Sequence, residues 1–307
     1  MTRRLAGPGR LGLLGFLGPL GLGLGVALGG CLAPTTSTSP SSAPPDVGPT
    51  PVVRQFELAT TVWIDGFVLT FHTAIASLDV KGGPVSVLTR IENAGNDPAT
   101  LDVPIRLTAS GATFELSRAT QLPEIPAGAV AELTLEFEIV GRATIEDGVL
   151  RIGRTGDHQV QIPFGPGPVK VISLEPQAVN IAGSATSGSL RIALHRAVVR
   201  WDLPDWHTEL PNASEVLTLT YDATFTGDFS GGFAFTADNV GLRLPDGTIV
   251  APRADGHSQS IELIAAKQTI LGLQSRFEIP TGLTGAFALI VRDGTAASKA
   301  IPFTIGP

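Results

Sequence analysis

From Val53 onward the chain consists of short runs in which apolar and polar residues alternate, separated by clusters of Gly, Pro, Asn and Asp. Clear examples are residues 85–91, which end at an Asn-Ala-Gly-Asn turn, and residues 132–139, which place acidic and apolar side chains on opposite faces. Runs of this length with a period of two indicate antiparallel β-strands. The 36 Gly and 24 Pro among 307 residues also argue against a predominantly helical protein. We therefore predict an all-β fold of antiparallel β-sandwiches.

Three short sequence matches recur in the same order in the two halves of the chain. They are FHTAI and LHRAV (residues 71–75 and 194–198), FEI twice (137–139 and 277–279), and IPFGPGP and IPFTIGP (162–168 and 301–307). The offsets are 123, 140 and 139 residues, so the second copy carries extra residues between its early strands. We interpret the matches as a tandem duplication. It predicts one sandwich module in residues 53–168 and a second in residues 169–307, each with about seven or eight strands.

The same comparison assigns roles to aromatic and histidine residues. His72 and His195 occupy equivalent positions of the repeat, which favours strand residues over metal or catalytic groups. Residues 260–274 are the one candidate for a helix, and we expect no more than a short turn there. Six Phe residues lie in strand-like runs and are predicted to fill the two cores: Phe114, Phe137, Phe225, Phe235, Phe277 and Phe287.

One turn of the first module carries a family resemblance. Glu92-Asn93-Ala94-Gly95 follows an alternating run, and a Pro-Ala-Gly turn at residues 126–128 precedes the next one. This pattern resembles bacterial immunoglobulin-like modules, most closely the telokin-like domains of bacterial lipoproteins. The second copy departs from it, with Thr-Phe-Thr-Gly at residues 224–227. The resemblance implies immunoglobulin-like sandwiches and brings no catalytic residue with it.

The first thirty residues differ in composition from the rest of the chain. Arg3, Arg4 and Arg10 give a basic start, and no acidic residue occurs before Asp46. Residues 11–30 form an uncharged apolar run that contains eight Gly and one Pro, and no basic cluster follows it. A basic start followed by such a run is typical of an export signal rather than of a permanent membrane span. We predict a signal peptide in residues 1–30 and leave open whether export uses the general or the twin-arginine route.

The apolar run ends in LGGC at residues 28–31, and Cys31 is the only cysteine of the chain. This sequence resembles the lipobox of bacterial lipoproteins. The resemblance implies cleavage before Cys31 and modification of its thiol and new amino terminus with fatty-acyl chains such as palmitate. The expected location is the bacterial cell envelope, with the protein held in a membrane by its lipid and facing the periplasm or the exterior. That membrane is the outer one if the cell has two, because Leu32 rather than Asp follows the cysteine.

Residues 31–52 are rich in Pro, Ser and Thr and contain one charged residue, Asp46. Such a segment buries too little apolar surface to fold, and its prolines favour extended conformers. We predict a lipid-anchored linker. At about 3 Å per residue it would reach up to about 60 Å from the bilayer.

No catalytic, cofactor-binding or metal-binding motif occurs in the sequence. The formal charge of −7 gives no basic footprint for nucleic acid. A single cysteine excludes an intrachain disulfide and a cysteine-rich metal site. Asp246-Gly247 could belong to a calcium loop, but after Leu-Pro it is typical of a hairpin turn.

One segment, residues 201–209, is unusual because it holds two of the three Trp residues together with three acids and a His. It falls where the second copy is longer than the first, so we expect an inserted loop. Trp201, Trp206 and His207 are candidate partner-binding residues, since exposed Trp side chains anchor proteins or stack on sugars. In the structural alternative, the Trp side chains cover the open end of the sandwich.

The sequence favours a noncatalytic, lipid-anchored envelope protein that binds or scaffolds a protein or glycan partner through tandem sandwiches. Two alternatives stay open. One is a surface carbohydrate-binding module. The other is an envelope hydrolase whose site lies around residues 201–209 and His257.

Overall fold

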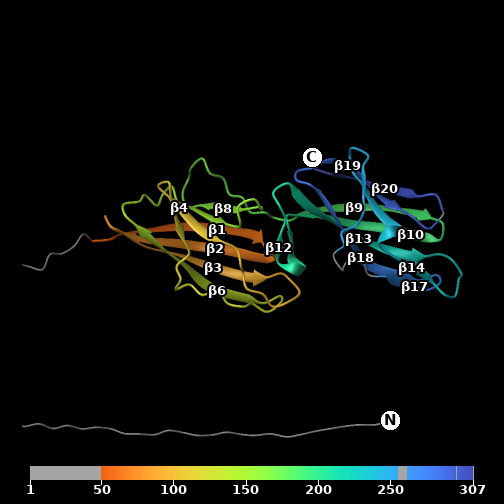
Figure 1. The fold of residues 1–307 in the computed structure, drawn as a ribbon, viewed down its shortest axis with the longest axis horizontal. Coiled ribbons are helices and arrows are strands. Elements are labelled where there is room, and N and C mark those ends of the chain that lie inside the picture. The colour runs from red at the N-terminus through yellow and green to blue at the C-terminus, as the bar shows by residue number, and fades with distance from the viewer. Residues whose placement is uncertain (1–49, 255–260, 295, 307) are drawn as a thin grey trace, which may run out of the picture. The chain divides into compact units, whose positions relative to one another are not determined.

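The computed structural model describes residues 50–254, 261–294 and 296–306. The predicted signal peptide, Cys31, residues 31–49 of the predicted linker, and His257 lie outside the described residues. In the part that is described, strands are joined by turns, and the helical elements are two single 3-10 turns, η1 (Pro204–Trp206) and η2 (Ala237–Asn239) (Figure 1). The prediction of an all-β protein is confirmed.

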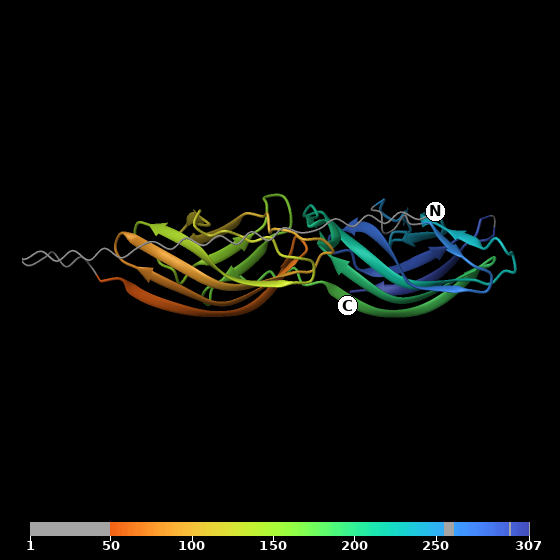
Figure 2. The same cartoon turned by 90° about the horizontal axis from the view of Figure 1, so that it is seen from below.

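The first sandwich consists of two antiparallel four-stranded sheets. The longer sheet has the order β1-β2-β3-β6, with β1 (Val52–Ile64), β2 (Phe67–Leu78), β3 (Gly82–Asn93) and β6 (Val130–Val140). The shorter sheet has the order β5-β4-β7-β8, with β4 (Ile105–Ala109), β5 (Ala112–Glu115), β7 (Val149–Ile152) and β8 (Val160–Pro163). Figure 2 shows the long orange strands in one layer and shorter yellow and green strands in the other.

The second sandwich has the same two-sheet plan. Its longer sheet has the order β18-β13-β10-β9, with β9 (Gln177–Ser187), β10 (Leu190–Arg200), β13 (Ser214–Phe225) and β18 (Thr269–Pro280). Its shorter sheet has the order β16-β15-β19-β20, with β15 (Val240–Arg243), β16 (Ile249–Val250), β19 (Gly285–Val291) and β20 (Lys299–Ile305). Two small hairpins are added, β11 (Asp202–Leu203) with β12 (Thr208–Glu209), and β14 (Phe233–Phe235) with β17 (Glu262–Ile264).

The two sandwiches match strand for strand and also in register. Phe137 of β6 lies opposite Val85 of β3, and Phe277 of β18 lies opposite Leu217, the corresponding residue of β13. A bulge interrupts β2 at His72 and β10 at His195. The order β2-β3-β6 facing β4-β7-β8 is that of strands A-B-E and C-F-G of the immunoglobulin fold. This agreement is what a duplicated module would produce.

Each sandwich has its own hydrophobic core, because alternate residues of each sheet point inward. The first core extends from Leu58 to Phe164 and the second from Ile181 to Ile305. Five of the six Phe residues predicted to be internal are buried. Phe114 is only partly buried and packs against the first core, because it lies on β5, an edge strand.

Two further expectations have clear outcomes. Asp246-Gly247 forms the turn between β15 and β16, where Gly247 has φ +90° and its N–H donates to Leu244 O. The expectation that residues 260–274 hold no more than a short turn in place of a helix is confirmed for the described residues 261–274, where the chain turns at residues 265–268. The rest of this segment forms β17 and the start of β18, because Ile-Glu-Leu-Ile alternates as an edge strand and Lys267, with φ +58°, stops any helix.

Candidate functional site: the junction between the two sandwiches

Residues 201–209 lie in the connection between β10 and β13, which spans residues 201–213. The corresponding connection of the first sandwich, between β2 and β3, spans only residues 79–81. The additional residues form the hairpin β11–η1–β12, in which Asp202 pairs with Glu209 and Leu203 with Thr208. We call residues 202–209 the junction hairpin, because its side chains contact the first sandwich.

Local sequence explains why the hairpin forms. Pro204 begins the 3-10 turn with its fixed φ, and His207 ends it in the left-handed region at φ +46°. The N–H of Leu210 donates to Trp201 O over 2.9 Å and closes the loop. Leu203 and Leu210 pack with Val216 into a small apolar cluster of their own.

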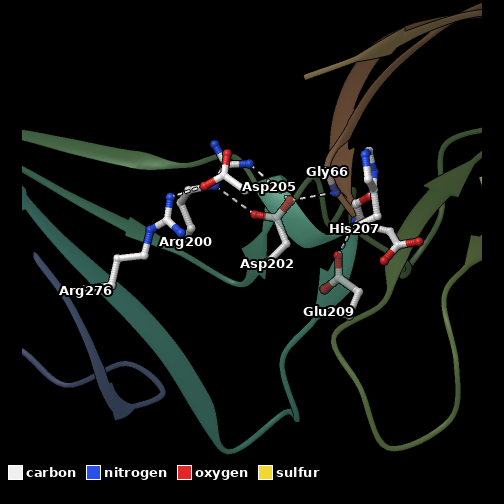
Figure 3. Close-up of polar contacts among 8 residues, drawn as sticks. Gly66, Arg200, Asp202, Asp205, His207, Glu209 and Arg276 are labelled. Atoms are coloured by element: carbon white, nitrogen blue, oxygen red, sulfur yellow. Dashed lines mark hydrogen bonds and ion pairs between the residues drawn. The ribbon is translucent and has the colours of Figure 1, made fainter. Parts of the chain in front are cut away.

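The hairpin uses two carboxylates to hold the turn between β1 and β2. Glu209 Oε1 accepts a hydrogen bond from the backbone N–H of Asp65 over 2.5 Å, and Asp202 Oδ2 accepts one from Gly66 over 3.0 Å (Figure 3). Asp65 and Gly66 both have positive φ, as a two-residue hairpin turn requires. The arrangement therefore supplies partners to turn N–H groups that the strands leave unpaired.

His207 also binds the hairpin to the same turn. Its Nδ1 donates to Asp65 O over 2.9 Å, and its ring lies tilted against Phe67 with 4.8 Å between ring centroids. A Cβ atom on Gly66 would lie 2.7 Å from Pro204 O, and one on Gly95 would lie 2.5 Å from His207 Nε2. The hairpin therefore reaches this surface only because both positions are glycine.

Polar contacts continue outward from this centre. Asn96 Nδ2 donates to Asp205 Oδ1 over 2.6 Å, and Arg276 of β18 forms an ion pair with the same carboxylate. The guanidinium of Arg276 also lies 5.2 Å from the ring centroid of Trp206, which is a cation–π distance. Asp205 thereby links the Asn93–Asn96 turn of the first sandwich to β18, in the longer sheet of the second sandwich.

A second strip of contacts lies beside the hairpin. His158, in the loop between β7 and β8, donates through Nε2 to Ser214 O over 2.9 Å, and its ring lies edge-on to Trp201 at 6.3 Å. The N–H of Asn212 donates to Gly156 O over 3.1 Å. The junction is thus held at the β1–β2 turn, at the Asn93–Asn96 turn and at the β7–β8 loop.

Carboxylates dominate the buried part of the junction. Asp65, Asp202 and Glu209 are only 3%, 4% and 8% exposed. Asp202 is matched by Arg200, whose Nε and Nη2 donate to its two oxygens over 2.8 and 3.0 Å. Burial raises the pKa of Asp65 to about 7 and that of Glu209 to about 9, because the charged forms lose water.

The three candidate residues occupy different environments. His207 packs into the first sandwich, Trp201 is half-buried beside His158, and Trp206 is 42% exposed. Asp202 and His207 come together at the β1–β2 turn, whereas Asp205 points toward Asn96 and Arg276. In the described part of the chain, no group of three or more His, Cys, Asp and Glu residues is placed to hold a metal ion.

The sequence indicated that residues 201–209 are unusual, but it did not indicate that they bind the β1–β2 turn. Asp65-Gly66 between two alternating runs is a strong hairpin signal, and it locates the turn. Nothing in the local sequence indicates that this turn meets carboxylates 136 and 144 residues further along the chain.

The corresponding turn of the second sandwich is closed differently. Ser189 stands where the first sandwich has Gly66, and its N–H donates to Asp293 Oδ2 over 2.6 Å. Its hydroxyl donates to the same oxygen over 2.8 Å. In the second sandwich the partner of this turn N–H therefore comes from the same sandwich, and in the first it comes from the neighbouring one.

Comparison with known proteins adds little to this description. The sequence matches no protein-family model, and no curated protein matches it. A solved structure that is similar is "The crystal structure of the conserved domain protein from Bacillus anthracis", at 12% identity and a TM-score of 0.22, covering 82% of this chain and 90% of that chain. A TM-score this low supports no conclusion about fold or function. Among the described residues, no helix combines the length and apolar character that a membrane crossing needs.

Proposed function

We propose that this protein is a noncatalytic, lipid-anchored cell-envelope scaffold that presents its second sandwich at a fixed orientation to the first. The junction hairpin is the observation that carries the proposal. An insertion whose side chains grip the neighbouring sandwich through Glu209, Asp202 and His207 opposes the free hinge motion expected of two domains joined by a linker.

The remaining parts of the proposal come from the sequence. LGGC at residues 28–31 supports lipid attachment at Cys31, and the Pro/Ser/Thr-rich segment supports a tether between membrane and sandwiches. A hydrolase is less well supported, because Asp202 and Glu209 are buried and both accept hydrogen bonds from backbone N–H groups.

Spin-label distance measurements test the scaffold directly. We would use the full chain with Cys31→Ser, so that Val140→Cys and Leu271→Cys, both exposed, carry the labels. We expect a narrow distance distribution at pH 5. Replacing residues 201–213 with the Asp-Val-Lys of residues 79–81 should broaden it while both sandwiches stay folded. A broad distribution in the parent chain at pH 5 would refute the scaffold.

A groove beside the junction supports a second candidate function, the binding of a sugar chain. It has a volume of about 680 Å³, which suits a small ligand, and its lining includes Trp201, His158, Glu175 and Gln177. An aromatic face beside carboxylate and amide groups suits a sugar ring. On a glycan array, Trp201→Ala should weaken binding about thirtyfold or more, whereas Trp206→Ala, outside the groove, should not.

A further inference from the structure

The centre of the junction contains polar atoms that lack partners. Asp65 Oδ1, Glu209 Oε2 and His207 Nε2 are all buried, and none has a hydrogen-bond partner among the described residues. A buried acceptor without a donor is costly, and an ionised carboxylate is costlier still. A proton on a carboxyl oxygen removes the charge and creates a donor.

The charged groups that act on the Asp65 and Glu209 carboxyls are mostly negative and do not compensate a negative charge there. Beyond burial, the positive charge of Arg154 lowers the pKa of Asp65, and the negative charges of Asp202 and Asp102 raise it. Beyond burial, the negative charges of Asp202, Asp65 and Asp157 all raise the pKa of Glu209.

Other charged groups nearby are engaged elsewhere. Arg200 binds Asp202 through both of its donors, and Arg276 pairs with Asp205. His207 gives its Nδ1 hydrogen to Asp65 O. Within the described residues, Arg154 is therefore the one cation that acts on Asp65, and Glu209 has no cation among the charges acting on it.

We propose that the junction is a proton-controlled hinge, closed while Glu209 and Asp65 hold protons and loosened when both carboxyl groups ionise. The proposal rests on the proposed scaffold function, because it needs a junction that is closed at low pH. Both carboxyl groups lie buried within the contact. The hydrogen bond that Glu209 accepts from the Asp65 N–H favours ionised Glu209, but burial outweighs it and raises the pKa of that carboxyl.

The direction of the effect follows from linkage. The pKa values of Asp65 and Glu209 are raised from 3.8 to about 7 and from 4.5 to about 9 in the closed junction. The closed state therefore binds protons more tightly than the open state, and its advantage falls as pH rises through these values. Tyr221, whose pKa burial raises to about 12, stays neutral over the same range.

The spin-label pair described above tests the hinge on the full chain at pH 5, 7 and 9.5. We expect a narrow distribution at pH 5 and a broad one at pH 9.5. The double variant Glu209→Gln, Asp65→Asn carries neutral groups of the same shape, and Asn tolerates the left-handed backbone of residue 65. It should stay narrow at every pH. Glu115→Gln, an exposed residue paired with Arg106, is the matched control and should respond as the parent does.

The outcomes separate the two proposals. A parent chain that is narrow at all three pH values overturns the hinge and leaves the scaffold standing. One that is broad at pH 5 overturns both. Should the double variant fail to fold, infrared difference spectra of the parent chain provide the second test. A protonated carboxyl band at pH 7 that is lost in Glu209→Gln supports the hinge, and its absence in the parent overturns it. A pH response abolished by His207→Gln but retained in Glu209→Gln also overturns it.

Discussion

At the scale of single residues, two glycines decide whether the sandwiches can meet. Gly66 needs its positive φ for the β1–β2 turn as well as the space that a missing side chain leaves. Gly95 has no such backbone requirement, so only the approach of the junction hairpin demands glycine there. The Glu-Asn-x-Gly motif of the sequence thus ends in the residue that admits His207.

Gly95→Ala should open the junction without unfolding either sandwich. The new Cβ would lie 2.5 Å from His207 Nε2 and 2.7 Å from Pro204 O, and the second of these is backbone. We expect a loss of about 1–3 kcal/mol in the closed state, seen as a broader spin-label distribution at pH 5. Gly167→Ala meets nothing within 4 Å and is the control. Equal effects of the two changes would contradict this account.

Cys31→Ala tests the anchor. If the cysteine carries the lipid, this variant should incorporate no labelled palmitate and should leave the membrane fraction, because acyl chains supply about 0.8 kcal/mol per buried methylene. Unchanged labelling and partitioning would show that the attachment point lies elsewhere.

At the scale of elements, β6 and β18 perform the same task in the two cores. Phe137 and Phe277 are almost fully buried and lie at the same register position of matching strands. The short sheet and the long sheet close over them in each sandwich. The alternation of apolar and polar residues is what places them there.

Phe137→Ala and Phe277→Ala should each lower the free energy of unfolding of their own sandwich by about 3–5 kcal/mol, because each leaves a cavity. Chemical denaturation followed by near-ultraviolet circular dichroism measures both. An effect below 1 kcal/mol at either position would mean that the two rings are not equivalent core residues.

The elements also show how far sequence reasoning reaches. Strand alternation and the FEI match predict two all-β sandwiches and the burial of Phe137 and Phe277, since both follow from local pattern. The run Ile-Glu-Leu-Ile at residues 261–264 fits a helix or a strand by its pattern alone, and the pairing of β17 with β14 decides for a strand. The contact of the junction hairpin with the β1–β2 turn depends on tertiary packing, which local periodicity does not encode.

At the scale of the whole molecule, the junction couples the stabilities of two otherwise separate cores. No core cluster of described residues includes members of both sandwiches, so the hydrogen bonds across the junction provide much of the coupling. Coupling of this kind depends on solution conditions more than apolar burial does.

Calorimetry should reveal this coupling. The closed junction binds protons at Asp65 and Glu209 more tightly than the open one, so its stability is complete below the ordinary pKa of 3.8 and falls as pH rises from there through about 7 for Asp65 and about 9 for Glu209. We expect one merged unfolding transition at pH 5 and two resolved transitions at pH 9.5. Two transitions whose separation does not change with pH would contradict the expectation.

The turn between β9 and β10, at Ser189, differs from the β1–β2 turn in one respect that decides whether it can bind a junction hairpin. Ser189 N–H, the group that corresponds to the Gly66 N–H, is already bound by Asp293. The junction hairpin of another copy of the chain could not accept a hydrogen bond from this N–H, because Asp293 already does so. The negative charge of Asp293 would also repel the hairpin carboxylates. The contact that joins the two sandwiches therefore cannot form in the same way at the β9–β10 turn of the second sandwich.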